Sequence, residues 1–358
     1  MSKSKIILPF GRGETDLTRL KDVIVPEIFT GYVQTQTAEL SALIQSGAVV
    51  MDERLSANLA GAGLTFNEPF YNDLKDEDED IAVDKGNPSK PSNITTGSEV
   101  QVRMSRSKSW GSADLVSALI GNDPMTAIGN RVSAWWVRRL QAAYIATWKG
   151  VFANAKKFHD DDLTFDISGS SFVNNQTNFT ASNFINATAT MGDAARGLTM
   201  IMVHSTVRNR MRQLNLIDFI PDARGETQFE YYQGLRIIED DSMPHDPSTG
   251  VFESWLFGPG ATAMGAGSPK VPTAVVRDEA ANQGAGEEVL HNRVEWILHP
   301  VGHAWAAAQT AKGGPSNAAT TNDLAHEDSW RRAFPERKQL KVARLITREY
   351  QGSLNAAL

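Results

Sequence analysis

The chain has 358 residues, a formal net charge of −7, a hydrophobic fraction of 41% and no cysteine. The hydrophobic fraction is that of ordinary globular proteins, so most of the chain should fold, as one elaborate domain or two coupled lobes. The lack of cysteine excludes disulfides, thiolate metal sites and cysteine nucleophiles. The acidic excess argues against a dedicated nucleic-acid-binding surface, which usually carries surplus lysine and arginine.

Neither a secretory signal nor a membrane span is predicted. The residues after Met1 lack an apolar core of signal-peptide length. No run approaches the ~18 consecutive apolar residues of a membrane-spanning helix. We therefore expect a protein that is made and folded in the cytoplasm.

The first 60 residues predict an arm with a short helix. Residues 1–34 are polar and interrupted by glycine and proline, which is typical of an extended segment. An apolar face predicts a helix over 35–46, and Gly47 follows it at the position of a C-cap. Val49–Met51 then reads as a brief strand.

A long hairpin is predicted next. Residues 64–70 and 99–106 have strand character, and the second segment alternates apolar and polar residues. Between them lies the acidic run Asp76–Asp80, followed by glycine and prolines, which cannot bury a core of its own. The two strands should therefore project from the body and carry a charged, flexible tip.

The strongest helical signal begins at Asp123, a good N-cap, with Pro124 at the first helical position. Apolar residues recur at spacings of three and four to about residue 157, which predicts a helix roughly 50 Å long at about 1.5 Å per residue. Its apolar positions are Met125, Ile128, Val132, Trp135, Trp136, Leu140, Tyr144, Trp148, Val151 and Phe152.

Beyond a polar stretch near 160–181 the pattern becomes α/β. Two helices are predicted, one capped by Ser182 or Asn183 and reaching Ala195, the other capped by Ser205. Strands are predicted over 198–203, 234–238, 255–257, 289–298 and 338–347.

Several short patterns suggest chemistry, but each has a simpler structural interpretation. His299 and His303 have the spacing of a helical zinc site, yet Pro300 and Gly302 break any helix there, which favours a turn. The remaining patterns are read as solvated loops, turns or caps: His159–Asp162, Asp73–Asp80, Gly258–Ala263, Glu239–Asp241 and His204–Ser205. No catalytic, cofactor-binding or metal-binding residue and no cofactor is predicted.

The order of the predicted parts is informative: an arm, a projecting hairpin, a long helix and then an α/β lobe. This order resembles the Hong Kong 97-type shell fold, which is shared by the major capsid proteins of tailed double-stranded DNA phages and by encapsulins. Roughly residues 25–350 take part in the resemblance. Six segments carry it in the family's order: Ser41–Phe70, Met200–Leu214, Tyr232–Pro244, Leu256–Ala261, Trp296–Trp305 and Lys338–Thr347.

The resemblance implies an α+β fold with an N-terminal arm, an extended hairpin, a peripheral domain with the spine helix and an α/β axial lobe. The corresponding division of the chain is 1–60 (arm), 61–108 (hairpin), 109–180 (peripheral domain), 181–288 (axial domain) and 289–358 (returning strands and C-terminus). Residues expected to contact neighbouring subunits are Phe66, Phe70, Tyr71, Val100, Val102 and Met104.

The resemblance also implies a structural virion protein, not an enzyme. It would self-assemble as hexamers and pentamers into an icosahedral capsid around double-stranded DNA, without sequence-specific DNA binding. Expected partners are the chain itself, portal and scaffold proteins and cement proteins, with assembly in the host cytoplasm. An encapsulin-like nanocompartment is the alternative from the same fold, and a hydrolase using Asp or Glu with His is the enzymatic alternative.

Overall fold

The computed structural model describes residues 47–74, 77–79, 81, 84, 91–120, 124–214, 217–221, 228–307 and 313–350. The predicted arm, the predicted helix over 35–46, Asp123 and most of the predicted hairpin tip lie outside these residues. The chain divides into two compact units. The smaller unit contains residues 106–136 and 269–294, and the larger contains 47–105, 137–268 and 295–350.

In the smaller unit, strands stack against the first part of a long helix. Strand β13 (Thr273–Asp278) pairs antiparallel with β14 (Glu287–Pro300), which also pairs with β4 (Met104–Ala113). The short helices are α4 (Asp114–Ile120) and α8 (Ala281–Gly284). Trp135 meets Trp110 edge-on at 5.3 Å between ring centroids, and Trp136 donates its indole N–H to Asn292 of β14 at 2.6 Å.

The long helix is confirmed. Helix α5 runs from Pro124 to Phe158, 35 residues, or about 52 Å at about 1.5 Å per residue. Its second half supplies large buried aromatic residues of the larger unit. The ring centroids of Trp148 and Phe257 lie 5.0 Å apart, and those of Phe152 and Trp255 lie 5.5 Å apart. Within the part of the chain that the structure describes, no helix combines the length and apolar character needed to cross a membrane.

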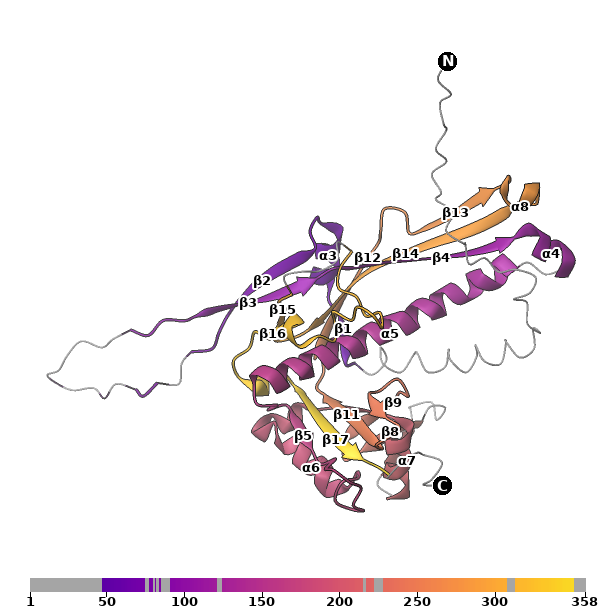
Figure 1. Cartoon of the computed structure of the whole chain (residues 1–358). Coiled ribbons are helices and arrows are strands. Elements are labelled where there is room, and N and C mark those ends of the chain that lie inside the picture. The colour runs from indigo at the N-terminus through magenta and orange to yellow at the C-terminus, as the bar shows by residue number, and fades with distance from the viewer. Residues whose placement is uncertain are drawn as a thin grey trace. The chain divides into compact units, whose positions relative to one another are not determined.

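An eight-stranded sheet forms the α/β part of the larger unit (Figure 1), in the order β5-β17-β11-β6-β9-β8-β7, with β10 beside β11. The strands are β5 (Thr164–Asp166), β6 (Met200–Val203), β7 (Ile217–Pro221), β8 (Gln228–Tyr232), β9 (Leu235–Glu239), β10 (His245–Asp246), β11 (Val251–Phe257) and β17 (Val342–Arg348). Strand β6 is buried at every position and runs parallel to β9, as its continuous apolar run predicts. The predicted strands of this region are therefore confirmed, although β17 starts four residues late because Arg337–Gln339 forms a 3-10 turn.

The two helices beside this sheet begin differently from the prediction. Helix α6 (Ala181–Ala189) is capped by Thr180, whose hydroxyl accepts the Asn183 N–H, so neither Ser182 nor Asn183 is the cap. It stops before Ala195 because a 3-10 turn starts at Gly192, which has a φ of 58°. Helix α7 (Ser205–Gln213) is capped by the ring nitrogen of His204, which accepts the Thr206 N–H, and Ser205 is its first residue.

The part of the five-stranded sheet β1-β12-β14-β13 that falls in the larger unit carries a helix that the sequence did not predict. Strand β1 (Val49–Met51), which was predicted, pairs parallel with β12 (Thr262–Gly267), and β12 pairs antiparallel with the end of β14. Helix α3 (Glu53–Ala60) starts at the N-cap Asp52 and lies directly on β12. A Cβ at Gly265 would stand 2.6 Å from that of Leu55, so the glycine makes this approach possible.

Candidate intersubunit site: the hairpin and its root

The predicted hairpin is confirmed. Strand β2 (Thr65–Tyr71) pairs antiparallel with β3 (Thr96–Val102), from Thr65 opposite Val102 to Tyr71 opposite Thr96. Among the described residues these two strands pair only with each other. Figure 1 shows them leaving the neighbourhood of α3 as an arm. Glu77, Asp78 and Glu79, the described part of the predicted acidic tip, are exposed.

Side chains of β2 alternate between two environments. Phe66, Glu68 and Phe70 are half-buried, and the positions between them are exposed. Tyr71 is the most open of the aromatic side chains here, at 73% exposure. Pro69 has no N–H to offer a further strand, which is typical of a sheet edge. Within the described residues, the hairpin therefore has one half-buried face and one exposed face.

The hairpin root, defined here as Glu68, Phe70, Glu99, Gln101 and Arg103, is held first by helix α3. Arg54 of α3 donates to Glu68 at 2.5 Å, and Gln101 donates to the other oxygen of Glu68 at 2.7 Å. The Arg103 guanidinium donates to two backbone carbonyls at the end of α3, those of Leu59 at 2.5 Å and Gly61 at 2.6 Å.

A second set of contacts joins the root to the turn after β14. Glu99 Oε2 lies 2.8 Å from His299 Nε2, and Glu99 Oε1 accepts the Gly302 N–H at 2.7 Å. Phe70 meets Phe334 edge-on at 5.0 Å between ring centroids. Opposite Phe70, Gly97 leaves space for this ring, because a Cβ at Gly97 would overlap it.

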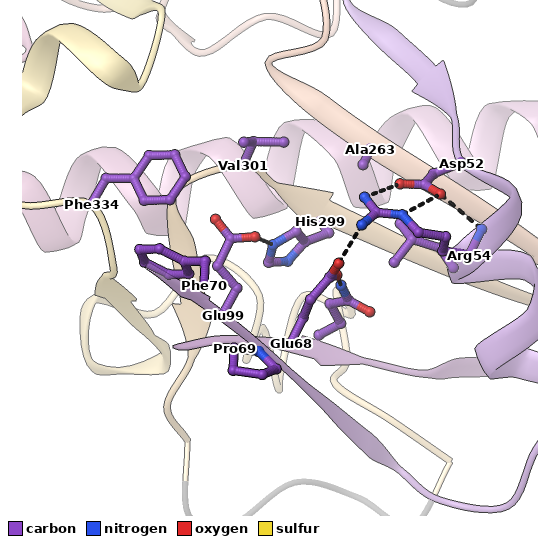
Figure 2. Close-up of a pocket in the computed structure, with 12 residues that line it drawn as sticks. Asp52, Arg54, Glu68, Pro69, Phe70, Glu99, Ala263, His299, Val301 and Phe334 are labelled. Carbon is purple, nitrogen blue, oxygen red and sulfur yellow. Dashed lines mark hydrogen bonds and ion pairs between the residues drawn. The ribbon is translucent and has the colours of Figure 1, made fainter. Parts of the chain in front are cut away.

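A cavity of about 320 Å³ lies between the two sets of contacts. Figure 2 shows Arg54 between the carboxylates of Asp52 and Glu68, and Glu99 turned toward His299. The cavity is lined by Asp52, Arg54, Leu55, Glu68, Pro69, Phe70, Glu99, Gln101, Ala263, His299, Val301 and Phe334. Acidic, basic and aromatic side chains thus meet at one joint between the hairpin and its unit.

The turn predicted between the two histidines is present, and the histidines themselves lie on the strands that flank it. Pro300 ends β14, Gly302 has a φ of 81°, and His303 begins β15 (His303–Trp305), which pairs with β16 (Trp330–Arg332). Burial lowers the pKa of His303 to about 3, so its imidazole is neutral at physiological pH. Over the described residues, no group of three or more His, Asp or Glu side chains has the arrangement of a metal site.

The other short patterns serve local structure. Asp162 accepts two hydrogen bonds from Arg332, at 2.8 and 2.6 Å. Asp240 accepts the Ser242 N–H at 2.8 Å in the predicted turn. A Cβ at Gly258 would lie 2.6 Å from the Gly197 carbonyl, so this glycine permits close packing of two loops.

The six residues predicted to reach neighbouring subunits fall into three groups. Tyr71 is open to solvent, whereas Phe66, Phe70 and Val100 are half-buried. Val102 and Met104 retain 2% and 0% exposure, and Met104 belongs to β4, beyond the hairpin. These two side chains are core residues of their own chain and have no surface to offer a neighbour. The sequence did not single out Glu99, and it indicated only a turn at His299; the contact between them joins positions far apart in the chain.

Known proteins that are similar to this chain are phage capsid proteins. No protein-family model matches. The major capsid protein of Bacillus phage SPP1 is 37% identical over 328 residues, which cover 90% of this chain and 95% of the phage protein.

Two solved structures share the fold at low sequence identity. The capsid asymmetric unit of cyanophage Pam1 aligns with a TM-score of 0.53 and 10% identity, covering 88% of this chain and 93% of that one. The capsid of Ralstonia phage GP4 also gives 0.53, with 8% identity, covering 87% and 89%. The fold is the predicted α+β capsid fold of the Hong Kong 97 type. Because the SPP1 protein matches nearly end to end, the chain belongs to the family of major capsid proteins of tailed phages.

Proposed function

We propose that copies of this chain assemble as hexamers and pentamers into the icosahedral shell that encloses a phage's double-stranded DNA. The full-length similarity to a phage major capsid protein is the observation that carries this proposal. The hairpin supports it, because alternate side chains of β2 are exposed and Tyr71 is exposed to 73%. We propose Tyr71, with the exposed parts of Phe66, Phe70 and Val100, as contacts with neighbouring subunits.

Repetition accounts for stability in such a shell. Each hairpin contact is small, but many small contacts in a closed assembly combine through multivalency. Residues 1–34, for which the sequence predicts an extended arm, are proposed to reach another subunit in the same way.

The net charge of −7 suits a container that confines DNA and does not adhere to it. Portal, scaffold and cement proteins are the proposed partners, and assembly is proposed to take place in the host cytoplasm before the protein becomes part of the virion. The role is proposed to be structural, without catalysis. The similarities to known proteins give no support to the nanocompartment or hydrolase alternatives.

Electron microscopy and sedimentation of the recombinant chain, expressed alone and with its neighbouring phage genes, test this function. Closed shells or rings of five and six subunits are expected. A compact monomer under every condition would contradict the proposal.

Deletion of residues 75–91 tests the hairpin separately. The shortened chain should fold but close shells poorly. A control chain in which the same residues are replaced by a Gly/Ser segment of equal length distinguishes reach from specific contact. Normal particles from the deletion would overturn the role of the hairpin.

A further inference from the structure

Two glutamates stand directly opposite each other at the hairpin root. In the β2–β3 register, Glu68 pairs with Glu99. Like charges at opposed positions of two strands are destabilising unless each has its own partner. Here the partners come from different elements: Arg54 of α3 for Glu68, and His299 with the Gly302 N–H for Glu99. The two carboxylates therefore tie the hairpin to two separate parts of its unit.

Backbone pairing alone cannot set the direction of the hairpin. Among the described residues its two strands form a sheet of their own, and an isolated two-stranded hairpin is only marginally stable in water. Its direction depends on side-chain contacts at the root. The cavity of about 320 Å³ beside them leaves space into which the root can move if one set of contacts is lost.

Burial distinguishes the two glutamates. The Arg54 side chain is 73% exposed and that of Glu68 35%, so solvent screens this pair. The Glu99 side chain is 12% exposed and that of His299 3%. Removing one partner of a buried pair leaves the other partner buried and uncompensated. The loss of such a contact therefore costs more free energy than the loss of a surface pair.

We propose that Glu99 is a positioning residue that sets the direction of the hairpin by binding His299 and the Gly302 N–H. This inference rests on the proposed function for its consequence: a hairpin held in one direction meets a neighbouring subunit, and one that swings does not. The Phe70–Phe334 contact acts in the same joint, on the strand opposite Glu99.

The test measures hairpin direction without requiring assembly. Because the chain has no cysteine, Tyr71→Cys on the hairpin and Ile185→Cys on α6 accept spin labels selectively; both native side chains are exposed, at 73% and 52%. Distances between the labels are measured in unassembled full-length subunits. Glu99→Ala should broaden and shift a narrow distribution. Glu99→Gln, which keeps an acceptor for Gly302 and hydrogen-bonding reach to His299, should restore most of it.

Two further variants keep the result interpretable. His299→Ala removes the other partner of the same contact. It should broaden the distribution of label distances at least as much, because it leaves the Glu99 carboxylate buried and opposite Glu68. Glu79→Ala removes an exposed acid from the same hairpin and should leave the label distances unchanged. Circular dichroism and thermal melting verify that each variant is folded.

Shell formation by the same variants without cysteine substitutions gives the second readout. Glu99→Ala should lose closed shells, while Glu99→Gln should keep most of them. Unchanged label distances in both Glu99→Ala and His299→Ala would overturn the positioning role, whatever the assembly result. Failure of the unsubstituted chain to form shells would instead count against the proposed function and leave the distance measurement decisive for Glu99.

Discussion

The indole N–H of Trp148 donates a hydrogen bond to the hydroxyl of Thr262, 3.0 Å away, and both side chains are fully buried. This contact joins the second half of α5 to β12, the strand on which α3 lies. A buried donor left without a partner costs about 1–3 kcal/mol.

Thr262→Val should therefore lower the free energy of unfolding by about 1–3 kcal/mol, because valine keeps the shape of threonine but cannot accept the bond. Denaturant unfolding of soluble subunits measures the change. Thr262→Ser keeps the hydroxyl and should cost less than the valine variant. An unchanged free energy of unfolding in the valine variant would contradict this prediction, and equal losses in the two variants would show that the methyl group contributes as much as the hydrogen bond.

Two glycines of α5 should respond to alanine with opposite signs. Glycine inside a helix is about 1 kcal/mol less favourable than alanine. At Gly129, where a Cβ would meet none of the described residues within 4 Å, alanine should stabilise the protein by up to about 1 kcal/mol. At Gly150 a Cβ would overlap the Leu324 carbonyl and lie 2.7 Å from the Trp330 ring, so alanine should destabilise it. Thermal melting of the two variants side by side tests this, and a gain at Gly150 would contradict the described approach of the Leu324 loop to the helix.

Local signals predicted the elements whose causes are local. The length and phase of α5 follow from apolar residues at spacings of three and four, and β6 follows from a continuous apolar run. The caps were less predictable because several residues near each helix start are chemically competent. At α6 the N-cap is Thr180, whose backbone is extended. The sequence Thr-Ala-Ser-Asn also offers a serine and an asparagine, and nothing in it shows which of the three residues is the cap.

Elements and contacts that depend on distant residues could not be predicted. Helix α3 is short, and its stability depends on lying against β12 at Gly265, more than 200 positions along the chain. The Glu99–His299 contact spans 200 positions, and each residue alone looks ordinary. The same limit explains Val102 and Met104: their alternation predicted a strand correctly, but which face another part of the chain would cover is a tertiary property.

Acid should destabilise the protein partly through His303. Burial lowers the pKa of this imidazole to about 3, below the ~6.5 of an unfolded chain. As the pH falls below ~6.5, the His303 imidazole therefore binds a proton in the unfolded state but stays neutral in the folded state. Stability should decline between pH ~6.5 and ~3, by up to about 1.4 kcal/mol per pH unit from this group.

Removal of the titrating group should flatten that decline. His303→Gln should be less stable than the parent near pH 7, because a well-packed buried ring is lost, but its unfolding free energy should fall less steeply from pH 6 to pH 4. Urea unfolding at several pH values provides the comparison. Parallel curves for the two proteins would mean that His303 does not carry this part of the acid sensitivity.

Alanine substitutions at Tyr71 and Met104 should have different effects: the first should impair assembly, and the second should lower the stability of the fold. Tyr71→Ala removes an exposed side chain whose cross-strand partner is Thr96, and should change the free energy of unfolding by less than about 1 kcal/mol. Met104→Ala opens space at a side chain with no exposure and should cost about 2–5 kcal/mol. If Tyr71 meets a neighbouring subunit as proposed, its variant should nevertheless be the one that yields fewer closed shells per folded subunit, counted by sedimentation. Full assembly of Tyr71→Ala would remove Tyr71 from the proposed interface and leave the half-buried Phe66, Phe70 and Val100 as the positions to examine.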